Sequence, residues 1–298
     1  MRAQGENKSG AKGLLWWLVL LLVAVLVVHG DNYLHPTDTD YTAADRVTVH
    51  FIDVGQGCAT LIQSGTEGIL VDAGEAVYAD RVIGYLNDCG VCSLAFVVAS
   101  HPHADHIGAL PAVMQAFPTG AVILPRLSKD NIPATMCYEH LLKTIQSEKI
   151  KAIAAKPQAS YSLPNVTLTI LGPLVQDVDL NNMSVVCTVR AFDTLLLLTA
   201  DAGIPAQQRL VEAGSDLRCD VFQVPHHGAD NALCEALLDL ARPQTAVISC
   251  GKNNDYGHPH RAVLSALSQR GANIYRTDER SHITVSCYAD GYRVDTAK

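Results

Sequence analysis

The chain has 298 residues, of which 48% are apolar and 17% are charged, and its formal net charge is -8. A chain of this size and composition can bury a large core, enough for one large domain or two fused halves. The acidic balance argues against a sequence-independent nucleic-acid binder, because such proteins hold phosphates with a surplus of Lys and Arg. An anionic substrate would therefore need local cations, which bound metal ions could supply.

The first predicted element is the uncharged apolar run LLWWLVLLLVAVLVV (14–28), within a segment that extends to residue 30. The tail 1–13 before it is basic and the residues after it are acidic, which predicts an N-terminus on the cytoplasmic side of the membrane and the bulk of the chain on the other side. Fifteen apolar residues are fewer than the roughly 20 that usually span a membrane, so segment 14–30 fits both an uncleaved anchor and a signal-peptide core. We expect a single-pass protein of the cell membrane with its main domain extracytoplasmic, and a secreted protein is the alternative.

Polar residues 31–46, punctuated by Pro36, predict a linker, and one domain follows over residues 47–298. This domain begins with short β-rich runs and then alternates strand-like runs with helical patterns. The predicted strands of its first half are 47–54, 59–63, 68–74 and 94–100, with a helix near 77–88. Its second half has the strand-like runs TLTIL, VVCTVRAF, TLLLLTAD, VFQVP, TAVISCG and ITVSCY, with helices near 204–213, 231–240 and 260–270. Two β-rich halves with interspersed helices predict a four-layer α/β sandwich.

Nine cysteines are scattered along the chain, and their odd number leaves at least one thiol unpaired within it. Cys89 and Cys92 have the spacing of a redox or zinc pair, but the chain has no second pair of this kind. A local disulfide or inert thiols are therefore the favoured interpretations of this pair, and a functional role is the alternative.

The segment HPHADH (101–106) places three imidazoles and a carboxylate within six residues, directly after the apolar run 94–100. Core packing offers few reasons for that density. Imidazole and carboxylate are ligands that Zn²⁺ or Mn²⁺ accept, and their alternation on a loop can aim neighbours at two ions. The segment predicts a metal site at the end of a strand.

Three further positions fit the same site. Asp201 ends an apolar strand, where an ionised carboxylate would be costly without a compensating cation, although capping of the next helix is an alternative. Two adjacent histidines, the doublet 226–227, follow the run VFQVP in the same manner. His258 lies in the histidine-rich stretch YGHPH (256–260), where an ordinary turn histidine is the alternative.

Eight motifs in chain order resemble the metallo-β-lactamase-fold hydrolases, and most of all the subgroup that contains the hydrolase domain of ComEC-type DNA-uptake proteins and its stand-alone relatives. They are FIDVGQG (51–57), LVDAG (70–74), SHPHADHIGAL (100–110), NNMSVV (181–186), LLTADA (197–202), VPHHG (224–228), ISCGKNNDYGHP (248–259) and YRTDERSHITV (275–285). The match covers residues 47–288. It implies a four-layer αββα sandwich, preceded here by the N-terminal apolar helix.

The resemblance implies that these motifs hold two divalent metal ions, Zn²⁺ or Mn²⁺. Two histidines of segment 101–106 resemble ligands of the first ion, and its last two residues resemble ligands of the second. Asp201 resembles the carboxylate that bridges the ions. From the doublet, His227 is the predicted last ligand of the second ion, with His226 as the alternative. The predicted ligands are His101, His103, Asp105, His106, Asp201 and His227.

The resemblance also implies catalytic roles for Asp105, Asp201 and His258. His258 resembles a late histidine near the substrate, where it would contact a phosphoryl or oxyanion oxygen. Asp72 would orient the metal loop as a hydrogen-bond acceptor, with turn capping as the alternative.

The sequence departs from the family pattern at three places. Where typical members place another histidine, this chain has Asn182 and Ser184, as the ComEC-like subgroup does, so the first metal would be held less tightly. Cys58 replaces the acidic residue of the motif GQGD, and Ala229 replaces the serine of HHGS. Cys58, Asn182 and Ser184 are candidates for alternative ligands or for neighbours of the ligands. The loss of a carboxylate at Cys58 puts the rate or the substrate preference in doubt.

These features predict a metal-dependent hydrolase in which a metal-activated hydroxide attacks a phosphodiester of nucleic acid, such as DNA, or another extracytoplasmic phosphodiester. One alternative is hydrolysis of a lactone, thioester or β-lactam. Another is a non-catalytic binding subunit of a DNA-uptake or envelope assembly. The one apolar segment provides no channel, so a role in DNA uptake would need partner proteins.

Overall fold

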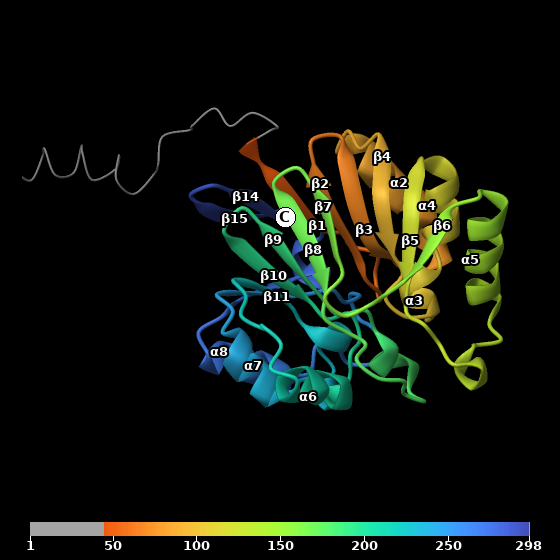
Figure 1. The fold of residues 1–298 in the computed structure, drawn as a ribbon. Coiled ribbons are helices and arrows are strands. Elements are labelled where there is room, and N and C mark those ends of the chain that lie inside the picture. Colours follow the sequence, from red (N-terminus) through yellow and green to blue (C-terminus); the bar gives the residue numbers. More distant parts are fainter. Residues whose placement is uncertain (1–44, 298) are drawn as a thin grey trace, which may run out of the picture. The chain divides into compact units, whose positions relative to one another are not determined.

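Two packed β-sheets with helices on their outer faces make up residues 45–297, the part of the chain that this computed structural model describes (Figure 1). The predicted tail (1–13), the apolar segment (14–30) and all but the end of the predicted linker (31–46) lie outside these residues. Within residues 45–297, no helix combines the length and the apolar character needed to cross a membrane.

The first sheet has eight strands in the order β15-β14-β1-β2-β3-β4-β5-β6, so β14 pairs with the first strand and β15 pairs with β14. Strands β3 to β6 run parallel, and the other pairs are antiparallel. The strands are β1 (Val47–Phe51), β2 (Ala59–Ser64), β3 (Glu67–Ala73), β4 (Ser93–Val98), β5 (Thr119–Leu124), β6 (Lys151–Ala154), β14 (Ile283–Tyr288) and β15 (Gly291–Thr296).

The second sheet has seven strands in the order β13-β12-β11-β10-β9-β8-β7. Strands β10 to β13 run parallel, and β7 to β10 form an antiparallel meander. The strands are β7 (Ser160–Leu163), β8 (Val166–Ile170), β9 (Cys187–Ala191), β10 (Thr194–Leu198), β11 (Val221–Gln223), β12 (Thr245–Ile248) and β13 (Asn273–Arg276).

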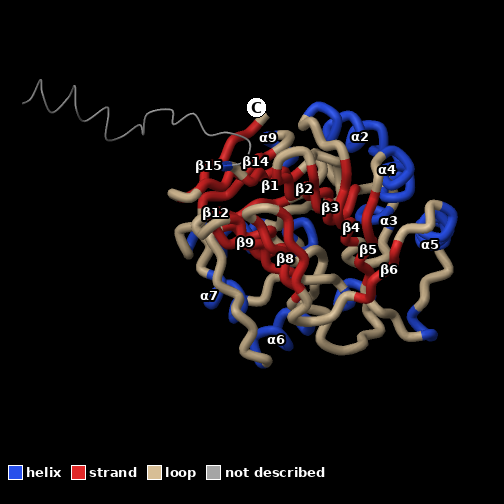
Figure 2. The backbone as a smooth tube through the Cα atoms, turned by 45° about the horizontal axis from the view of Figure 1, so that its top comes forward, coloured by secondary structure: helices blue, strands red, loops and turns tan. Residues whose placement is uncertain are grey.

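Helices cover the outer face of each sheet, and Figure 2 shows these layers from another direction. Apolar residues of α2, α4 and α5 pack on the first sheet, and those of α6, α7 and α8 pack on the second. The helices are α2 (Ala79–Asp88), α3 (Ala104–Ile107), α4 (Leu110–Ala116), α5 (Met136–Ser147), α6 (Ile204–Glu212), α7 (Glu235–Ala241), α8 (Arg261–Gln269) and α9 (Thr277–Arg280). The predicted four-layer αββα sandwich is confirmed.

The core between the sheets follows from the alternation of side chains along each strand. In β1, Val47, Val49 and Phe51 belong to the apolar cluster that both sheets share, because successive side chains of a strand point to opposite faces. Burying each of these side chains stabilises the fold by about 1.5–3 kcal/mol. His50 points the other way, toward α2, and its Nδ1 lies 3.0 Å from the hydroxyl of Tyr85.

The buried His50 makes folding stability depend on pH. Burial lowers its pKa to about 4, from 6.5. As the pH falls below about 6.5, His50 is protonated in the unfolded chain but stays neutral in the folded chain. The free energy of unfolding therefore decreases between pH 6.5 and 4. We expect H50Q to reduce the loss of unfolding free energy between pH 7 and pH 5 by about 2 kcal/mol. Urea unfolding of metal-free wild type and H50Q at the two pH values would measure this difference. An identical loss of unfolding free energy in the two proteins would contradict the prediction.

One predicted helix begins later than expected. The pattern over residues 231–240 predicts a single helix, but α7 begins at Glu235, after a 3-10 turn, η6 (Asp230–Ala232). The buried side chain of Gln207 explains the delay: its amide donates to the carbonyl of the last residue of η6 and accepts from the backbone nitrogen of Cys234. These backbone groups are therefore satisfied without a helix.

All nine cysteines lie within residues 45–297, and none of them forms a disulfide. Cys89 is half-buried at the end of α2, and Cys92 is exposed on the turn that follows. The local disulfide is therefore absent, and both residues are free thiols.

The predicted ligands follow strands at one end of the sandwich. Residues 101–106 follow β4 of the first sheet, while Asp201 and the doublet 226–227 follow β10 and β11 of the second. The doublet lies on a 3-10 turn, η5 (Pro225–Gly228). Because β4, β10 and β11 each run parallel to neighbours, their carboxyl ends form the edges where α/β proteins place ligands.

Candidate metal centre

The turn after β4 packs its three histidines together. His101 is 1% exposed at the start of the turn that leads into α3, and His106 is fully buried inside α3. The Nε2 of His101 lies 3.0 Å from the Nδ1 of His103, and the rings of His101 and His106 have centroids 4.2 Å apart. Three imidazoles of the first sheet therefore form one side of a site.

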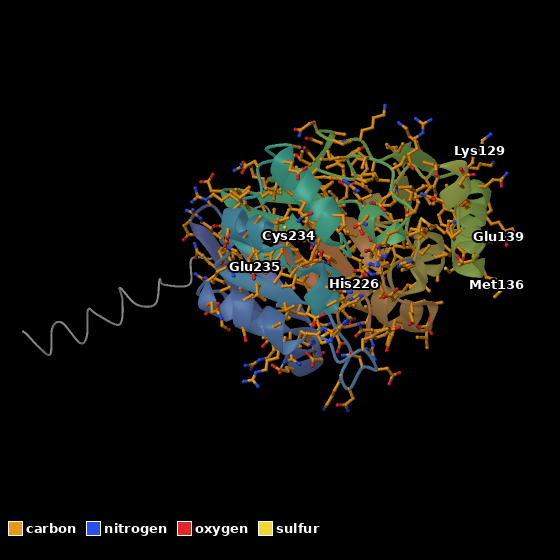
Figure 3. All side chains as sticks on the ribbon, turned by 90° about the horizontal axis from the view of Figure 1, so that it is seen from below. Lys129, Met136, Glu139, His226, Cys234 and Glu235 are labelled. Atoms are coloured by element: carbon orange, nitrogen blue, oxygen red, sulfur yellow. The ribbon has the colours of Figure 1, made fainter. Side chains whose placement is uncertain are left out.

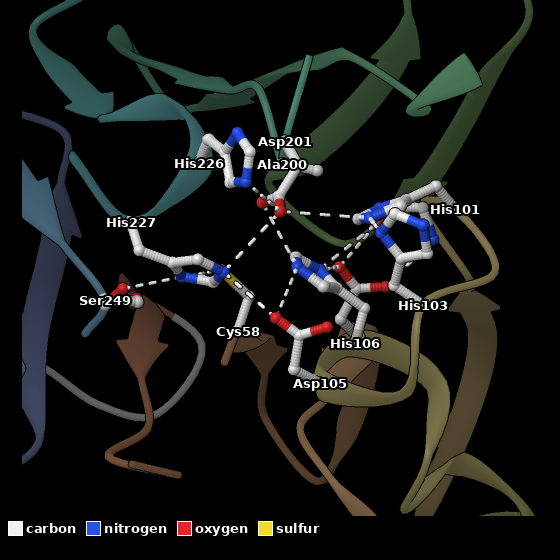
Figure 4. A network of polar contacts seen from close by, with 12 residues as sticks. Cys58, His101, His103, Asp105, His106, Ala200, Asp201, His226, His227 and Ser249 are labelled. Carbon is white, nitrogen blue, oxygen red and sulfur yellow. Dashed lines mark hydrogen bonds and ion pairs between the residues drawn. The ribbon is translucent and has the colours of Figure 1, made fainter. Parts of the chain in front are cut away.

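Asp201 brings a carboxylate from the second sheet to these imidazoles (Figure 4). Its oxygens lie 3.9 Å from the Nε2 of His101, 3.1 Å from that of His106 and 3.5 Å from that of His227. The carboxylate is 2% exposed. As expected from the sequence, segments that are distant along the chain converge on Asp201.

His227 and His226 both face Asp201, in different ways. His227 donates from Nδ1 to the carbonyl of Ser249 at 2.9 Å, which leaves its Nε2 facing Asp201 and, at 3.2 Å, Asp105. The Nε2 of His226 lies 3.7 Å from Asp201, and its side chain is 28% exposed against 3% for His227. In Figure 3, His226 lies on this end of the molecule between the regions of α5 and α7.

Four non-glycine residues at this site have left-handed backbone. His226 and His227 have φ of 49° and 56°, and Asp72 and Ala200 have φ of 58° and 46°. Non-glycine residues in this region cost about 1–3 kcal/mol each and gather at functional sites. The backbone nitrogen of His226 donates to the carbonyl of Ala200 at 3.0 Å, so two of these strained segments hold each other in place.

Asp72 fixes the orientation of the metal loop. Its carboxylate accepts from the backbone nitrogen of Ser100 at 2.8 Å, from the Ser100 hydroxyl at 2.6 Å and from Nδ1 of His106 at 2.7 Å. Asp72 therefore holds the proton on Nδ1 of His106, and the Nε2 of the same ring points at Asp201. This is the pattern in which an outer carboxylate sets the tautomer of a metal-binding histidine.

Removing the negative charge at Asp72 tests this contact. Asparagine tolerates left-handed backbone, so D72N keeps the turn but cannot accept from all three donors. We expect metal affinity to fall about 10- to 100-fold, as is usual when a histidine ligand loses its outer partner. Competition with a metal-binding dye measures the affinity. D130N, at an exposed site in the turn η3 (Lys129–Asn131), is the control, and equal affinities in both variants would contradict the role of Asp72.

Two buried atoms at the centre have no hydrogen-bond partner. The Nε2 of His106 and the Oδ1 of Asp201 lie 3.1 Å apart without the geometry of a hydrogen bond. Buried polar atoms of this kind cost about 1–3 kcal/mol unless something satisfies them. Imidazole nitrogens and carboxylate oxygens are donors that borderline divalent ions accept. The residues present therefore fit a divalent metal ion.

The charges at the site are also compatible with a divalent metal ion. Burial works against ionisation of Asp201, but the neighbouring histidines, His106 foremost, hold its pKa well below the usual range. Burial also opposes ionisation of Asp105, yet His227 and His106 lower its pKa to about 2. Two ionised carboxylates thus share a largely buried space, where protonated imidazoles or a bound cation must balance their charge.

His258 lies beside this cluster, held by a residue that sequence reasoning missed. The ring of His258 has its centroid 6.0 Å from that of His226. Gln56 accepts from the backbone nitrogen of Gly251 at 3.0 Å, so its amide nitrogen must donate to Nδ1 of His258 at 3.2 Å. The Nε2 of His258 therefore carries the proton. Burial lowers its pKa to about 4, so the ring is neutral at pH 7.

The loop around His258 is organised by Asn254, also missed. Its side chain donates to the carbonyls of Gly251 and His258 and accepts from the backbone nitrogen of His258 at 3.0 Å. The signal for Gln56 and Asn254 was their place inside the motifs FIDVGQG and ISCGKNNDYGHP.

The three candidate alternative ligands are all buried, with different surroundings. The Oδ1 of Asn182 and the hydroxyl of Ser184 have no hydrogen-bond partner, and the backbone nitrogen of Val185 donates to the carbonyl of Ser100 beside the metal loop. Cys58 approaches the cluster directly: its Sγ lies 3.8 Å from Nδ1 of His227.

The two sheets, their outer helices and this centre define a metallo-β-lactamase fold. The sequence profile of the metallo-beta-lactamase superfamily matches residues 52–137. YhfI from Bacillus subtilis, a metallo-beta-lactamase fold protein, is 17% identical with a TM-score of 0.52, over 81% of this chain and 100% of that one. CmlA, a diiron beta-hydroxylase from Streptomyces venezuelae, is 12% identical with a TM-score of 0.52, over 80% of this chain and 53% of that one. At such identities these likenesses show the fold alone.

The resemblance to ComEC-type competence proteins is confirmed by three curated relatives. ComE operon protein 3 of Bacillus subtilis is 24% identical over 79% of this chain and 32% of that protein. Recombination protein 2 of Haemophilus influenzae is 28% identical over 84% of this chain and 30% of that protein. Competence protein ComA of Neisseria gonorrhoeae is 28% identical over 89% of this chain and 35% of that protein. The chain thus spans about a third of the length of these relatives.

Proposed function

We propose that this protein is a metal-dependent phosphodiesterase that acts on nucleic acid or on another extracytoplasmic phosphodiester. One observation carries the proposal: the carboxylate of Asp201 lies within 3.9 Å of imidazole nitrogens that come from both sheets. That arrangement brings together donors from segments about a hundred residues apart in an enclosed space, and structural packing alone does not require it.

In this proposal the residues divide into two sets around Asp201. The close pair His101 and His103 would hold the first ion, and Asp105, His106 and His227 would hold the second, with Asp201 between them. The contact of Asp105 with His227 at 3.2 Å, and its distance of 3.7 Å from Nε2 of His106, support the second set. Divalent ions held there would lower the pKa of a water molecule and polarise the phosphoryl group.

The chain's own residues would place the substrate and neutralise its charge. Neutral His258 cannot act as an imidazolium acid at pH 7, but its Nε2–H can donate a hydrogen bond to an oxygen that gains negative charge. Gln56 keeps that proton on Nε2 by occupying Nδ1. The net charge of -8 makes such local groups and the bound ions the source of attraction for a phosphodiester.

The names of two relatives support nucleic acid as the substrate class. They are Recombination protein 2, whose similarity covers 84% of this chain, and Competence protein ComA, whose similarity covers 89%. The same metals would serve a lactone, a thioester or a β-lactam, so the substrate test must include them.

The purified full-length chain tests the proposal. We expect it to retain a divalent metal and to hydrolyse bis-p-nitrophenyl phosphate and at least one of single-stranded and duplex DNA. Lactone and phosphocholine esters complete the panel. Turnover of lactone alone would overturn the phosphodiesterase proposal. Absence of both metal and turnover would favour a non-catalytic binding subunit of a DNA-uptake or envelope assembly.

We further propose that the domain works outside the cytoplasm, attached through segment 14–30. The charge bias on the two sides of that segment supports this. A protease added to intact cells should digest the domain, while protection until the cells are lysed would overturn the topology.

A further inference from the structure

Cys58 is buried differently from the other buried cysteines. It is 4% exposed and belongs to none of the three apolar clusters of the described residues. The other five lie inside those clusters, where a free cysteine packs as a small side chain. They are Cys187, Cys219, Cys234, Cys250 and Cys287.

Its thiol instead faces the polar centre. One ligand atom each from Cys58, His106, Asp201 and His227 lie within 4.8 Å of one another. Four ligands at about 2.0–2.3 Å from a tetrahedral Zn²⁺ have neighbours about 3.3–3.8 Å apart. The set therefore needs a contraction of roughly 1 Å in its widest pair to enclose an ion.

Hydrogen bonding does not account for the position of the thiol. Its contact with Nδ1 of His227 is long, at 3.8 Å, and that nitrogen already donates to the carbonyl of Ser249 at 2.9 Å. Two other members of the set, Nε2 of His106 and Oδ1 of Asp201, are buried atoms without a partner. A cation among the four would satisfy both atoms and give the sulfur a role.

The backbone around Cys58 is built to hold it there. Its nitrogen donates to the carbonyl of Asp105 at 3.1 Å, and its carbonyl accepts from Gly74 at 2.8 Å. A Cβ at Gly57 would collide with the carbonyl of Asp105, so glycine is needed for this close approach. The thiol is thus fixed relative to the metal loop and to the end of β3.

We propose that Cys58 is a thiolate ligand of the ion held by His106, Asp201 and His227, and that it makes this site prefer Zn²⁺ to Mn²⁺. This inference rests on the proposed metal centre. On binding, the sulfur–metal bond forms and the thiol proton passes to water. Thiolate is a soft ligand that suits Zn²⁺, whereas Mn²⁺ is suited by carboxylates and water.

Cobalt spectroscopy of the metal-free, full-length chain tests the ligand. Bound Co²⁺ gives visible absorption with any ligands, and a near-ultraviolet sulfur-to-cobalt band only when a thiolate coordinates it. We expect wild type to show both and C58S to keep the visible bands but lose the ultraviolet one. C250A is the matched control, because Cys250 is equally buried but contacts Asp278 at 3.3 Å, and it should match wild type.

Each other outcome overturns the inference. Visible bands without the ultraviolet band in wild type, or an ultraviolet band that survives in C58S, would remove Cys58 from the ligands and leave the metal centre standing. No cobalt binding by folded wild type would overturn the centre and this inference together.

A second variant tests selectivity and protects against misfolding of C58S. C58D replaces the soft ligand by a hard one of the same charge. In a competition between the two ions, the affinity for Zn²⁺ relative to that for Mn²⁺ should be about 10-fold or more lower in C58D than in wild type. Circular dichroism would confirm that the variant is folded. An unchanged ratio would overturn the proposed preference.

Discussion

D201N is expected to lower phosphodiester turnover by more than about 100-fold, beyond the 10- to 100-fold that the loss of an outer partner costs a metal site. The carboxylate of Asp201 lies close to His101, His106, His226 and His227, so its charge holds the two sides of the centre together. Asparagine keeps the shape and removes the charge. Initial rates with bis-p-nitrophenyl phosphate and the metal content of the same sample measure the effect.

The control for D201N is a carboxylate at the same end of the molecule. Asp230 pairs with His260 at 3.3 Å, and its side chain is 57% exposed. D230N should keep full turnover and metal content. If D201N lost no more activity than D230N, the central role of Asp201 would be wrong.

Metal binding is expected to have the second largest effect, on thermal stability. The centre is buried and contains two ionised carboxylates and unpartnered atoms, so the folded chain should bind a divalent ion far better than the unfolded chain. At a concentration 100 times the Kd, binding adds about 2.7 kcal/mol. For a domain of this size that corresponds to a rise in Tm of about 5–10 °C.

Calorimetry with Zn²⁺ or Mn²⁺, and again after a chelator, measures that rise. The variant H106N, which removes a nitrogen at the centre, should respond much less than wild type. Equal shifts in the two proteins would mean that the stabilising ion binds elsewhere.

Sequence reasoning predicted those parts of the fold that depend on local patterns. The apolar run that contains strand β10 leads to Asp201, and core packing offers few reasons for segment 101–106, so both pointed to ligands after strands. The four layers followed from two β-rich halves with helices between them. Helix α5 was not predicted, because its exposed and half-buried residues outnumber its three buried ones and weaken the apolar pattern.

Features that arise between distant segments could not be predicted in the same way. The contact of Cys58 with His227 joins residues 169 positions apart, and only the packing of the two sheets creates it. The left-handed backbone at both residues of the doublet 226–227 has no local signal, because neither is glycine. Gln56 lies 202 positions from His258 along the chain, yet its amide sets the tautomer of that histidine.

Anomalous X-ray diffraction from crystals of the chain grown with Zn²⁺ tests the account most directly, because it locates the ion without reference to a substrate. The account predicts a peak at ligand distance, about 2.0–2.2 Å, from an oxygen of Asp201 and from Nε2 of His106. Zinc bound only away from Asp201 would contradict it.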